Sequence, residues 1–262
     1  MLTKYAIRIE TFIKFSTLLK ELVVRDIKVR YRKSMLGILW TLLNPILTML
    51  IMTLVFSAFF KSGVPNFHLY VLIGHIVFSF NADATNQSLT SIIGNASLIK
   101  KVYIPKYLFP LAKTMSCLVN LGFAMVSLVL VMLFTGVRIH VLMLGIFVPL
   151  IYLLMFSLGL GLLLAAVNVF FRDIGHLYSV FTTLWMYLTP IFYAVDILPP
   201  EVQGIIKLNP LYYYLSFIRQ IILDKTFPGL QENLICMFIS ITALIIGVIV
   251  FKKKQDKFIL HI

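Results

Sequence analysis

Long apolar runs separated by short basic segments dominate the chain. Residues 35–60 include no charged side chain. At about 1.5 Å per helical residue, this run is long enough to cross a hydrocarbon core of about 30 Å. The basic residues from Lys28 to Lys33 directly precede it, so we expect the span to start in the cytosol and to end outside.

Five further apolar runs predict an all-α integral membrane protein with six transmembrane helices. They cover residues 67–93, 111–134, 141–171, 174–193 and 233–251. The resulting domains are a cytoplasmic segment (1–34), a transmembrane domain (35–251) and a basic cytoplasmic tail (252–262). This topology leaves both termini in the cytosol and places most of the 23 lysines and arginines there; the exceptions are Lys61, Arg138, Lys207, Arg219 and Lys225.

Polar residues and helix breakers punctuate the spans. The latter half of the second run contains four polar residues that should not face lipid: Asn81, Asp83, Asn86 and Gln87. Pro45 predicts a kink in the first span, and Pro190 an interruption near the outer end of the fifth. Gly159 and Gly161 predict close helix contacts in the fourth.

Residues Glu10–Lys28 show apolar side chains at helical spacing with charged residues on the opposite side. This pattern predicts an amphipathic helix, and the adjacent span favours a position along the cytoplasmic membrane surface. The alternative is a frayed cytosolic leader.

Composition excludes an ordinary soluble domain, because 60% of the residues are hydrophobic and the mean hydropathy is +0.98. The net charge of +13 comes from basic segments beside apolar spans, so we expect contact with membrane lipids and not with nucleic acid. Cys117 and Cys236 lie within apolar runs, which indicates neither a disulfide framework nor a zinc site.

No pattern for catalysis is present in the sequence. The five histidines lack metal-ligand spacing, and there is neither a G-x-S-x-G elbow nor a G-x-x-x-x-G-K-[ST] phosphate loop. We therefore expect no catalytic, metal or cofactor residue in this chain. If ATP drives it, a separate subunit must bind the nucleotide.

Residues Asp196–Leu223 form the least regular part of the apolar sequence. Pro199-Pro200 and Asn209-Pro210 each introduce a stretch that is too short to span a membrane, so two short helices are predicted. On the outer side they would either lie in an interfacial aromatic belt or re-enter the membrane where protein or a cavity covers their backbone.

Nearly the whole chain resembles the permease subunits of type-2 ABC exporters that move lipid-linked O-antigen or teichoic acid. The resemblance rests on RYRKSMLGILWTLLNPILTMLIMTLVFSAFF, on NASLIKKVYIPKYLFPL, and on FFRDIG with the following TPIFY, LP and NP motifs. It implies a homodimer in the bacterial cytoplasmic membrane, paired with two ATPase subunits that bind ATP and Mg²⁺, and an undecaprenyl-linked glycan substrate.

The resemblance also implies functions for two segments. Residues 97–103, within a basic loop spanning residues 94–110, would form a coupling helix, and residues 196–223 would hold outer gate helices. A compact apolar face supports coupling to a soluble ATPase: Leu98, Ile99, Val102 and Tyr103. The alternative, an ordinary basic cytoplasmic loop, explains the lysines but not this face.

Aromatic side chains suit a glycan cargo, because their rings stack on the apolar faces of sugars. The candidates for the channel and gate are Trp185, Tyr187, Phe192, Tyr193, Tyr212, Tyr213 and Tyr214. Packing against lipid is the alternative for each of them. We place the cytoplasmic entrance at Arg30, Arg32, Lys33, Arg172 and Asp173.

Two other functions compete with glycan export. An ion-coupled secondary transporter would use Asp83, Lys113 and Asp173 as a relay. An integral-membrane enzyme acting on polyprenyl lipids would need acidic or histidine clusters, which the sequence lacks.

Overall fold

Helices make up the regular structure of the computed structural model, which describes residues 2–32, 36–37, 39–60 and 64–262. These residues contain no strand, which confirms the all-α fold class. The α-helices are α1 (Leu2–Tyr31), α2 (Leu39–Phe60), α3 (Phe67–Thr90), α4 (Ala96–Lys101), α5 (Leu108–Thr135), α6 (Phe147–Phe170), α7 (Ile174–Leu188), α8 (Pro200–Lys207), α9 (Pro210–Arg219) and α10 (Leu230–Lys254).

Shorter helical turns connect or extend these elements. The 3₁₀ turns are η2 (Ile93–Asn95), η3 (Val141–Ile146), η4 (Val195–Ile197) and η6 (Gln255–Leu260), and η5 (Gln220–Asp224) is a π-helical turn that extends α9.

Four helical stretches within the described residues are long and apolar enough to cross a membrane. They are Leu39–Ser57, Leu108–Thr135, Val141–Phe170 and Leu230–Leu260, and they match the first, third, fourth and sixth predicted spans. Between them, α3 is more polar, and α7 has 15 residues, or about 22 Å of helix. The described residues therefore contain four candidate spans plus two helices, α3 and α7, that the sequence also assigned to the membrane.

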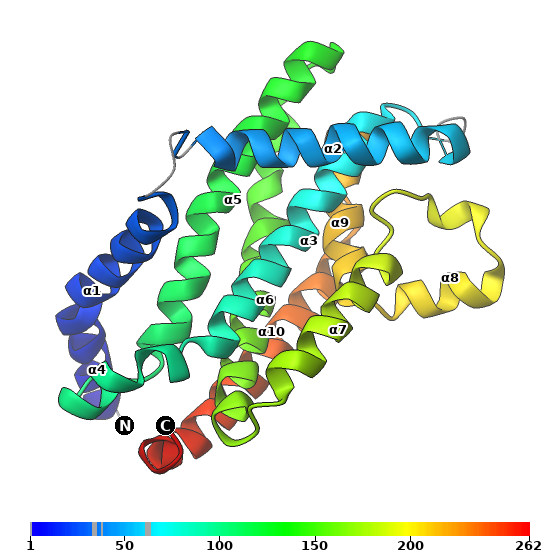
Figure 1. Cartoon of the computed structure of the whole chain (residues 1–262). Coiled ribbons are helices and arrows are strands. Elements are labelled where there is room, and N and C mark those ends of the chain that lie inside the picture. Colours follow the sequence, from blue (N-terminus) through cyan, green and yellow to red (C-terminus); the bar gives the residue numbers. More distant parts are fainter. Residues whose placement is uncertain (1, 33–35, 38, 61–63) are drawn as a thin grey trace.

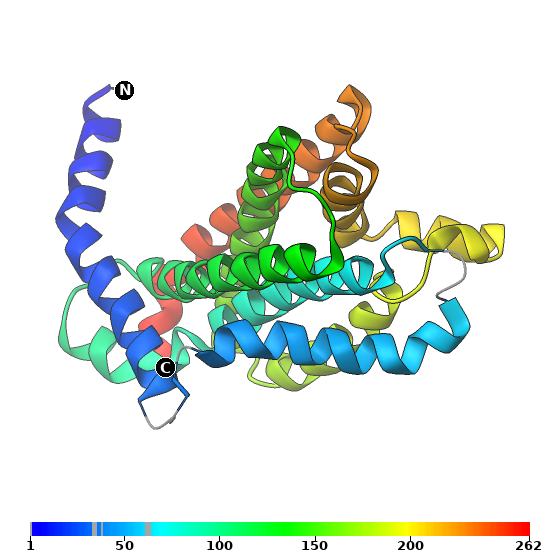
Figure 2. The ribbon, with the colours of Figure 1, turned by 90° about the horizontal axis from the view of Figure 1, so that it is seen from above.

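Helix α3 lies at the centre of the bundle, where it contacts α2, α5, α6, α7 and α9 (Figures 1 and 2). Its polar residues Asn81, Thr85 and Ser88 are buried. Asn81 Oδ1 accepts a hydrogen bond from Ser157 of α6 at 2.9 Å, and Thr85 Oγ1 accepts one from Tyr178 of α7 at 2.8 Å. Of the four residues predicted to be shielded from lipid, Asn81 is buried, Asn86 and Gln87 are half-buried and Asp83 is exposed, so the prediction is confirmed for Asn81.

Helices α6 and α10 pack so closely that their backbones are in contact. A Cβ atom added at Gly159 would collide with the backbone of Ala243, and one added at Gly247 would collide with the backbone of Gly159. The absence of side chains at both glycines lets the two backbones touch. Gly161 similarly leaves room for Ser88 of α3, so both predicted close contacts are confirmed.

The predicted amphipathic helix is part of the longer helix α1. Its apolar face packs on the bundle: Leu22 is buried in a cluster with residues of α5 and α6, and Phe15 and Leu19 are partly buried against it. Asp26 pairs with Lys113 of α5 at 2.9 Å. Protein therefore covers part of the face that the sequence assigned to the membrane surface.

Proline affects the two predicted positions differently. Helix α2 continues through Pro45. Helix α7 ends at Leu188, and Thr189, directly before Pro190, is extended, as expected for a residue that precedes proline. This confirms the interruption predicted for the fifth apolar run.

Candidate functional site

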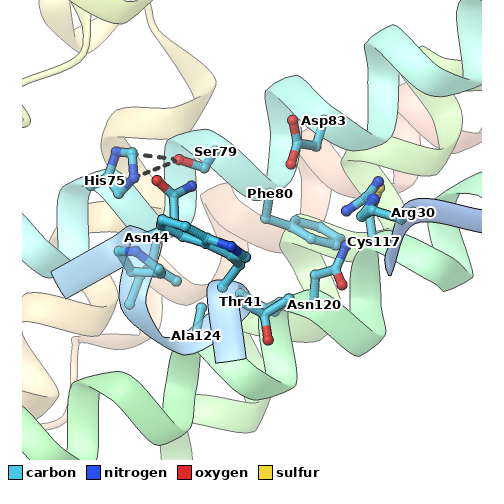
Figure 3. Close-up of a pocket in the computed structure, with 14 residues that line it drawn as sticks. Arg30, Thr41, Asn44, His75, Ser79, Phe80, Asp83, Cys117, Asn120 and Ala124 are labelled. Carbon is cyan, nitrogen blue, oxygen red and sulfur yellow. Dashed lines mark hydrogen bonds between the residues drawn. The ribbon is translucent and has the colours of Figure 1, made fainter. Parts of the chain in front are cut away.

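A polar cavity of about 350 Å³ lies between α2, α3 and α5, next to the end of α1 (Figure 3). Its polar lining consists of Arg30, Thr41, Asn44, His75, Ser79, Asp83 and Asn120. Apolar residues complete the wall: Trp40, Pro45, Ile76, Phe80, Cys117, Leu121 and Ala124. The cavity thus gathers hydrogen-bonding groups inside an otherwise apolar bundle.

Helical spacing explains how the polar groups of α3 come together. His75, Ser79 and Asp83 are four residues apart, so they form one stripe along the helix. Ser79 Oγ lies 3.3 Å from the ring nitrogens of His75. Asn44 of α2 and Asn120 of α5 line the same space from the other two helices (Figure 3). The cavity is therefore built by side chains of four helices, α1, α2, α3 and α5, and not by a loop.

Two opposite charges lie at one end of the cavity. Arg30, in the last turn of α1, interacts electrostatically with Asp83 of α3. Both border the cavity beside Phe80 and Cys117 (Figure 3). A charge within an apolar bundle requires such a partner or access to water. This end can accordingly hold a charged or hydrated group.

No metal site accompanies these groups. The described residues contain no group of three or more histidine, cysteine or acidic side chains placed to hold an ion. The cavity therefore offers hydrogen-bond donors and acceptors for binding a polar ligand.

On the other side of α3, Asn209 ties α9 to the end of α7. Its Oδ1 accepts a bond from the backbone N–H of Leu211 at 3.0 Å and one from Trp185 Nε1 at 2.7 Å. Its Nδ2 donates to Thr189 Oγ1 at 2.9 Å. Asn209 is therefore both the N-cap of α9 and the link to α7.

Arg219, at the end of α9, is the second anchor of this segment. Its side chain is buried, and Nη2 donates to the backbone oxygens of Tyr70 at 2.9 Å and Ile191 at 3.1 Å. The guanidinium also lies 3.3 Å from the centre of the Tyr70 ring. A Cβ at Gly74 would lie 3.0 Å from Nη2, so this glycine makes room for the arginine.

A second polar cavity, of about 360 Å³, lies beside Arg219. Tyr70, Asp196, Tyr212 and Gln220 contribute to its wall. The hydroxyl of Tyr70 donates to the backbone oxygen of Tyr193 at 2.8 Å. The segment between α7 and α8 is thus fastened to α3 on one side of this space.

At the opposite end of the bundle, the short helix α4 presents a divided surface. Ile99 is buried against the bundle and Leu98 is half-buried. Val102 and Tyr103 follow the helix and are 52% and 93% exposed. The predicted apolar face therefore has an inner half that holds α4 in place and an outer half that is open.

The fold and these sites can be compared with known proteins. Residues 17–223 match the family model for ABC-2 type transporters. The chain belongs to this family. It is 31% identical over 237 residues to an O-antigen export system permease protein, RfbA, of Klebsiella pneumoniae, covering 89% of this chain and 90% of the relative.

Other relatives carry similar names. An RfbA protein of Myxococcus xanthus is 28% identical over 94% of this chain and 95% of its own length. The capsule polysaccharide export inner-membrane protein CtrC of Neisseria meningitidis serogroup A is 25% identical over 76% of each chain. The family expected from the sequence is confirmed, and this ABC-2 family member is a multi-pass integral membrane protein.

In this ABC-2 protein the seven candidate channel aromatics do not share one environment. Trp185, Phe192 and Tyr214 are buried in the protein core, and Tyr214 shares a hydrogen bond of 2.7 Å with Ser240 of α10. Tyr187 is exposed. The half-buried residues are Tyr193, Tyr212 and Tyr213. The buried three have structural contacts, which leaves the other four accessible to a ligand.

The residues expected at the cytoplasmic entrance are also divided. Arg30 borders the polar cavity, whereas Arg32, Arg172 and Asp173 are exposed at helix ends and turns. Lys33 lies outside the described residues.

Sequence reasoning missed the roles of Asn209, Arg219 and the cavity residue His75. For Arg219 a signal was present, because an arginine within an apolar segment needs buried acceptors. The stripe from His75 to Asp83 was also readable as helical spacing. The second and third walls of the cavity depend on tertiary packing.

Proposed function

We propose that this chain is the membrane permease of an ATP-driven exporter for a lipid-linked polysaccharide. The single observation that carries the proposal is the polar cavity of α2, α3 and α5 within an apolar bundle. Hydroxyl-rich sugars need such donors and acceptors because hydrocarbon offers none. The names of the relatives, which are permeases for O-antigen or capsule export, support the same class of cargo.

The cargo is an undecaprenyl-linked O-antigen, teichoic acid or similar polymer. Arg30 favours a lipid carrier with a phosphate group, because guanidinium groups form strong bonds with phosphate oxygens. Asp83 beside it offsets part of this positive charge, so the ligand must also bring a hydrogen-bond donor, such as a sugar hydroxyl, to the carboxylate.

The topology that fits this function has six spans in the bacterial cytoplasmic membrane, with both termini in the cytosol. Helices α3 and α7, added to the four candidate spans, make up the six. The packing of α3 among five other helices supports a membrane position despite its polarity. Two copies of this chain and two ATPase subunits form the complex, and the ATPases bind ATP and Mg²⁺.

The outer gate comprises α8, α9 and their connections, at the centre of the homodimer. Helix α9 provides the fixed frame, because its apolar side chains are buried among α3, α6 and α10. The accessible aromatic residues Tyr187, Tyr193, Tyr212 and Tyr213 close the path and stack on sugars when it opens.

Helix α4 couples the permease to the ATPase through its open surface. The double variant Val102→Asp, Tyr103→Asp should abolish co-purification of the ATPase or leave ATP hydrolysis that drives no export. Ile99→Asp is a poorer test, because Ile99 is buried and a charge there would destabilise the fold. The control is Ile139→Asp, which adds a charge at an exposed apolar site in another loop. Normal assembly and export in the Val102, Tyr103 variant would refute the coupling assignment.

Cavity function can be tested in cells that depend on this permease for a surface polymer. The double variant Thr41→Leu, Ser79→Leu removes hydroxyls from two walls, and we expect at least tenfold less polymer at the surface, with lipid-linked polymer retained inside. The matched control, Thr48→Leu, Thr90→Leu, removes two hydroxyls from the same helices outside the cavity. Equal export by both variants, at equal amounts in the membrane, would reject the cavity as the path.

Energy coupling distinguishes this proposal from an ion-coupled carrier. Of the suggested relay, Lys113 pairs with Asp26 and Asp173 is exposed at the turn before α7, so the arrangement gives the relay no support. Purified alone, the chain should hydrolyse no ATP, and export by the complex in vesicles should persist after ion gradients are collapsed. ATP turnover by the isolated chain, or export that stops with the gradients, would contradict the proposal.

A further inference from the structure

A groove of about 640 Å³ lies along one side of the contact between α6 and α10, next to the loop that leads into α5. It shares no lining residue with either polar cavity. Its deep walls are apolar and come from three helices: Leu111, Leu158, Leu162, Leu244, Val248 and Phe251. Its mouth is formed by that loop and the end of α10, and it combines the polar residues Lys106, Lys252, Gln255 and Asp256 with Tyr103, Ile104, Pro105 and Tyr107.

The length of the apolar part matches one leaflet of a bilayer. Leu244 and Lys252 are eight residues apart on α10, which corresponds to about 12 Å along the helix axis. Half of a hydrocarbon core of about 30 Å is close to this value. The groove is apolar over this depth and basic at its mouth. It therefore complements a phospholipid, whose acyl chain is apolar and whose headgroup carries a negative phosphate.

The mouth has the charge needed to hold an anion. Lys106 and Lys252 oppose one carboxylate, Asp256, and two more lysines, Lys253 and Lys254, continue the end of α10. Lys106 is held in position: its Nζ donates to the backbone oxygen of Gln255 at 2.5 Å and lies 5.8 Å from the centre of the Phe258 ring. The ammonium group is therefore fixed above the apolar walls.

We propose that this groove binds one anionic glycerophospholipid of the surrounding bilayer. The phosphate lies between Lys106 and Lys252, and one acyl chain follows the groove along the surfaces of α6 and α10. Basic pockets between membrane helices recognise anionic headgroups in this way. The bound lipid bridges the loop after α4 to the end of α10, because these two segments supply the two lysines.

The test uses the purified full-length chain in neutral detergent, titrated with phosphatidylglycerol or with phosphatidylcholine of the same acyl chains. Native mass spectrometry counts the bound lipids. We expect one phosphatidylglycerol to bind at least tenfold more tightly than phosphatidylcholine. Equal affinity for the two lipids would overturn the proposal.

Two pairs of variants locate the site. Lys106→Gln, Lys252→Gln should weaken phosphatidylglycerol binding at least tenfold, whereas the control Lys100→Gln, Lys207→Gln, which removes two exposed lysines outside the groove, should not. Leu244→Trp should block the acyl chain, and the neighbouring exposed position supplies its control, Ile245→Trp. Retention of the lipid by both groove variants would place it elsewhere and overturn the proposal.

A competition separates a bilayer lipid from an exported one. Undecaprenyl diphosphate has the same chemistry of phosphate and apolar chain, and it is added to the protein already loaded with phosphatidylglycerol. Retention of the phospholipid supports the proposal. Displacement at equal or lower concentration would assign the groove to the exported lipid and overturn it. This result is independent of the export assay above, since no ATPase or glycan is present.

Discussion

Helices α8 and α9 have similar origins in the sequence and opposite roles in the structure. Each is short, begins with proline and lies in the segment assigned to the outer gate. Helix α9 packs against α3, α6 and α10, whereas α8 makes its main contacts with α9 and η4 and lies at the periphery (Figure 1). Val202 and Ile205 of α8, and Leu208 directly after it, are exposed. Helix α9 is also the longer of the two and buries more apolar side chains, and the polar anchors Asn209 and Arg219 at its two ends add to that packing.

The strongest test of this difference removes the anchor at the end of α9. Arg219→Leu removes the donor from the buried backbone oxygen of Ile191 and from the partly buried one of Tyr70, and the loss of a partner for a buried group costs about 1–3 kcal/mol. We expect a loss of about 2–6 kcal/mol, measured by thermal unfolding in lipid nanodiscs. Arg219→Lys keeps a donor and should lose less. Equal stability of the leucine variant and the parent would show that α9 is held by apolar packing alone.

The two Leu-Asn-Pro triplets provide the next test. Asn209→Ala removes the cap of α9 and the bonds to Trp185 and Thr189, so we expect a loss of about 1–3 kcal/mol. Asn44→Ala is the matched control, because Asn44 lines the polar cavity and is exposed there. It should reduce export and leave unfolding within about 0.5 kcal/mol of the parent. Comparable destabilisation by both substitutions would contradict the assigned roles.

A smaller effect is expected from the tyrosines of α9. Tyr214→Phe removes a buried hydroxyl and leaves Ser240 Oγ its bond to the Cys236 backbone, so the loss should be about 0.5–1.5 kcal/mol. Tyr212→Phe changes a half-buried residue at the outer cavity and should leave stability unchanged while weakening glycan passage. Chemical denaturation measures the stability of both variants. A stability loss in Tyr212→Phe together with weakened glycan passage in Tyr214→Phe would place Tyr214 in the path.

The smallest effect should come from α8. Gly204 has open space around the position of a Cβ, so Gly204→Ala should stabilise α8 by about 0.5–1 kcal/mol through helix propensity. Because α8 is peripheral, we expect this change in local hydrogen exchange and not in global unfolding. A large shift of global unfolding would mean that α8 belongs to the cooperative core.

The sequence predicted much of this architecture because apolar runs and breakers act locally. The runs around α2, α5, α6 and α10, the break before Pro190 and the two short helices all follow from hydropathy and proline. Hydropathy and proline do not predict which residues of the coupling face, or which of the gate aromatics, are buried and which are exposed. The sequence gives Ile99 and Tyr103 the same expected role, and likewise Tyr214 and Tyr212. Only packing against distant helices buries Ile99 and Tyr214 and leaves the other two accessible.

The polar cavity between α2, α3 and α5 could also be predicted only in part from the sequence. The spacing of His75, Ser79 and Asp83 predicts one polar stripe, but its partners Asn44 and Asn120 lie on helices whose rotation is set by their own contacts. Local patterns thus predict which side chains share a helix face, and tertiary contacts decide what that face meets.

The touching backbones of α6 and α10 have a mechanical consequence. Neither helix can slide past the other or rotate at Gly159 and Gly247 without a collision, and Tyr152 and Asn233 are joined by a hydrogen bond of 2.7 Å further along the pair. We therefore expect α6 and α10 to move together as one unit. A push on the lysine-rich end of α10 would travel to the level of Ser240, where α9 is attached, without being absorbed by a hinge on the way.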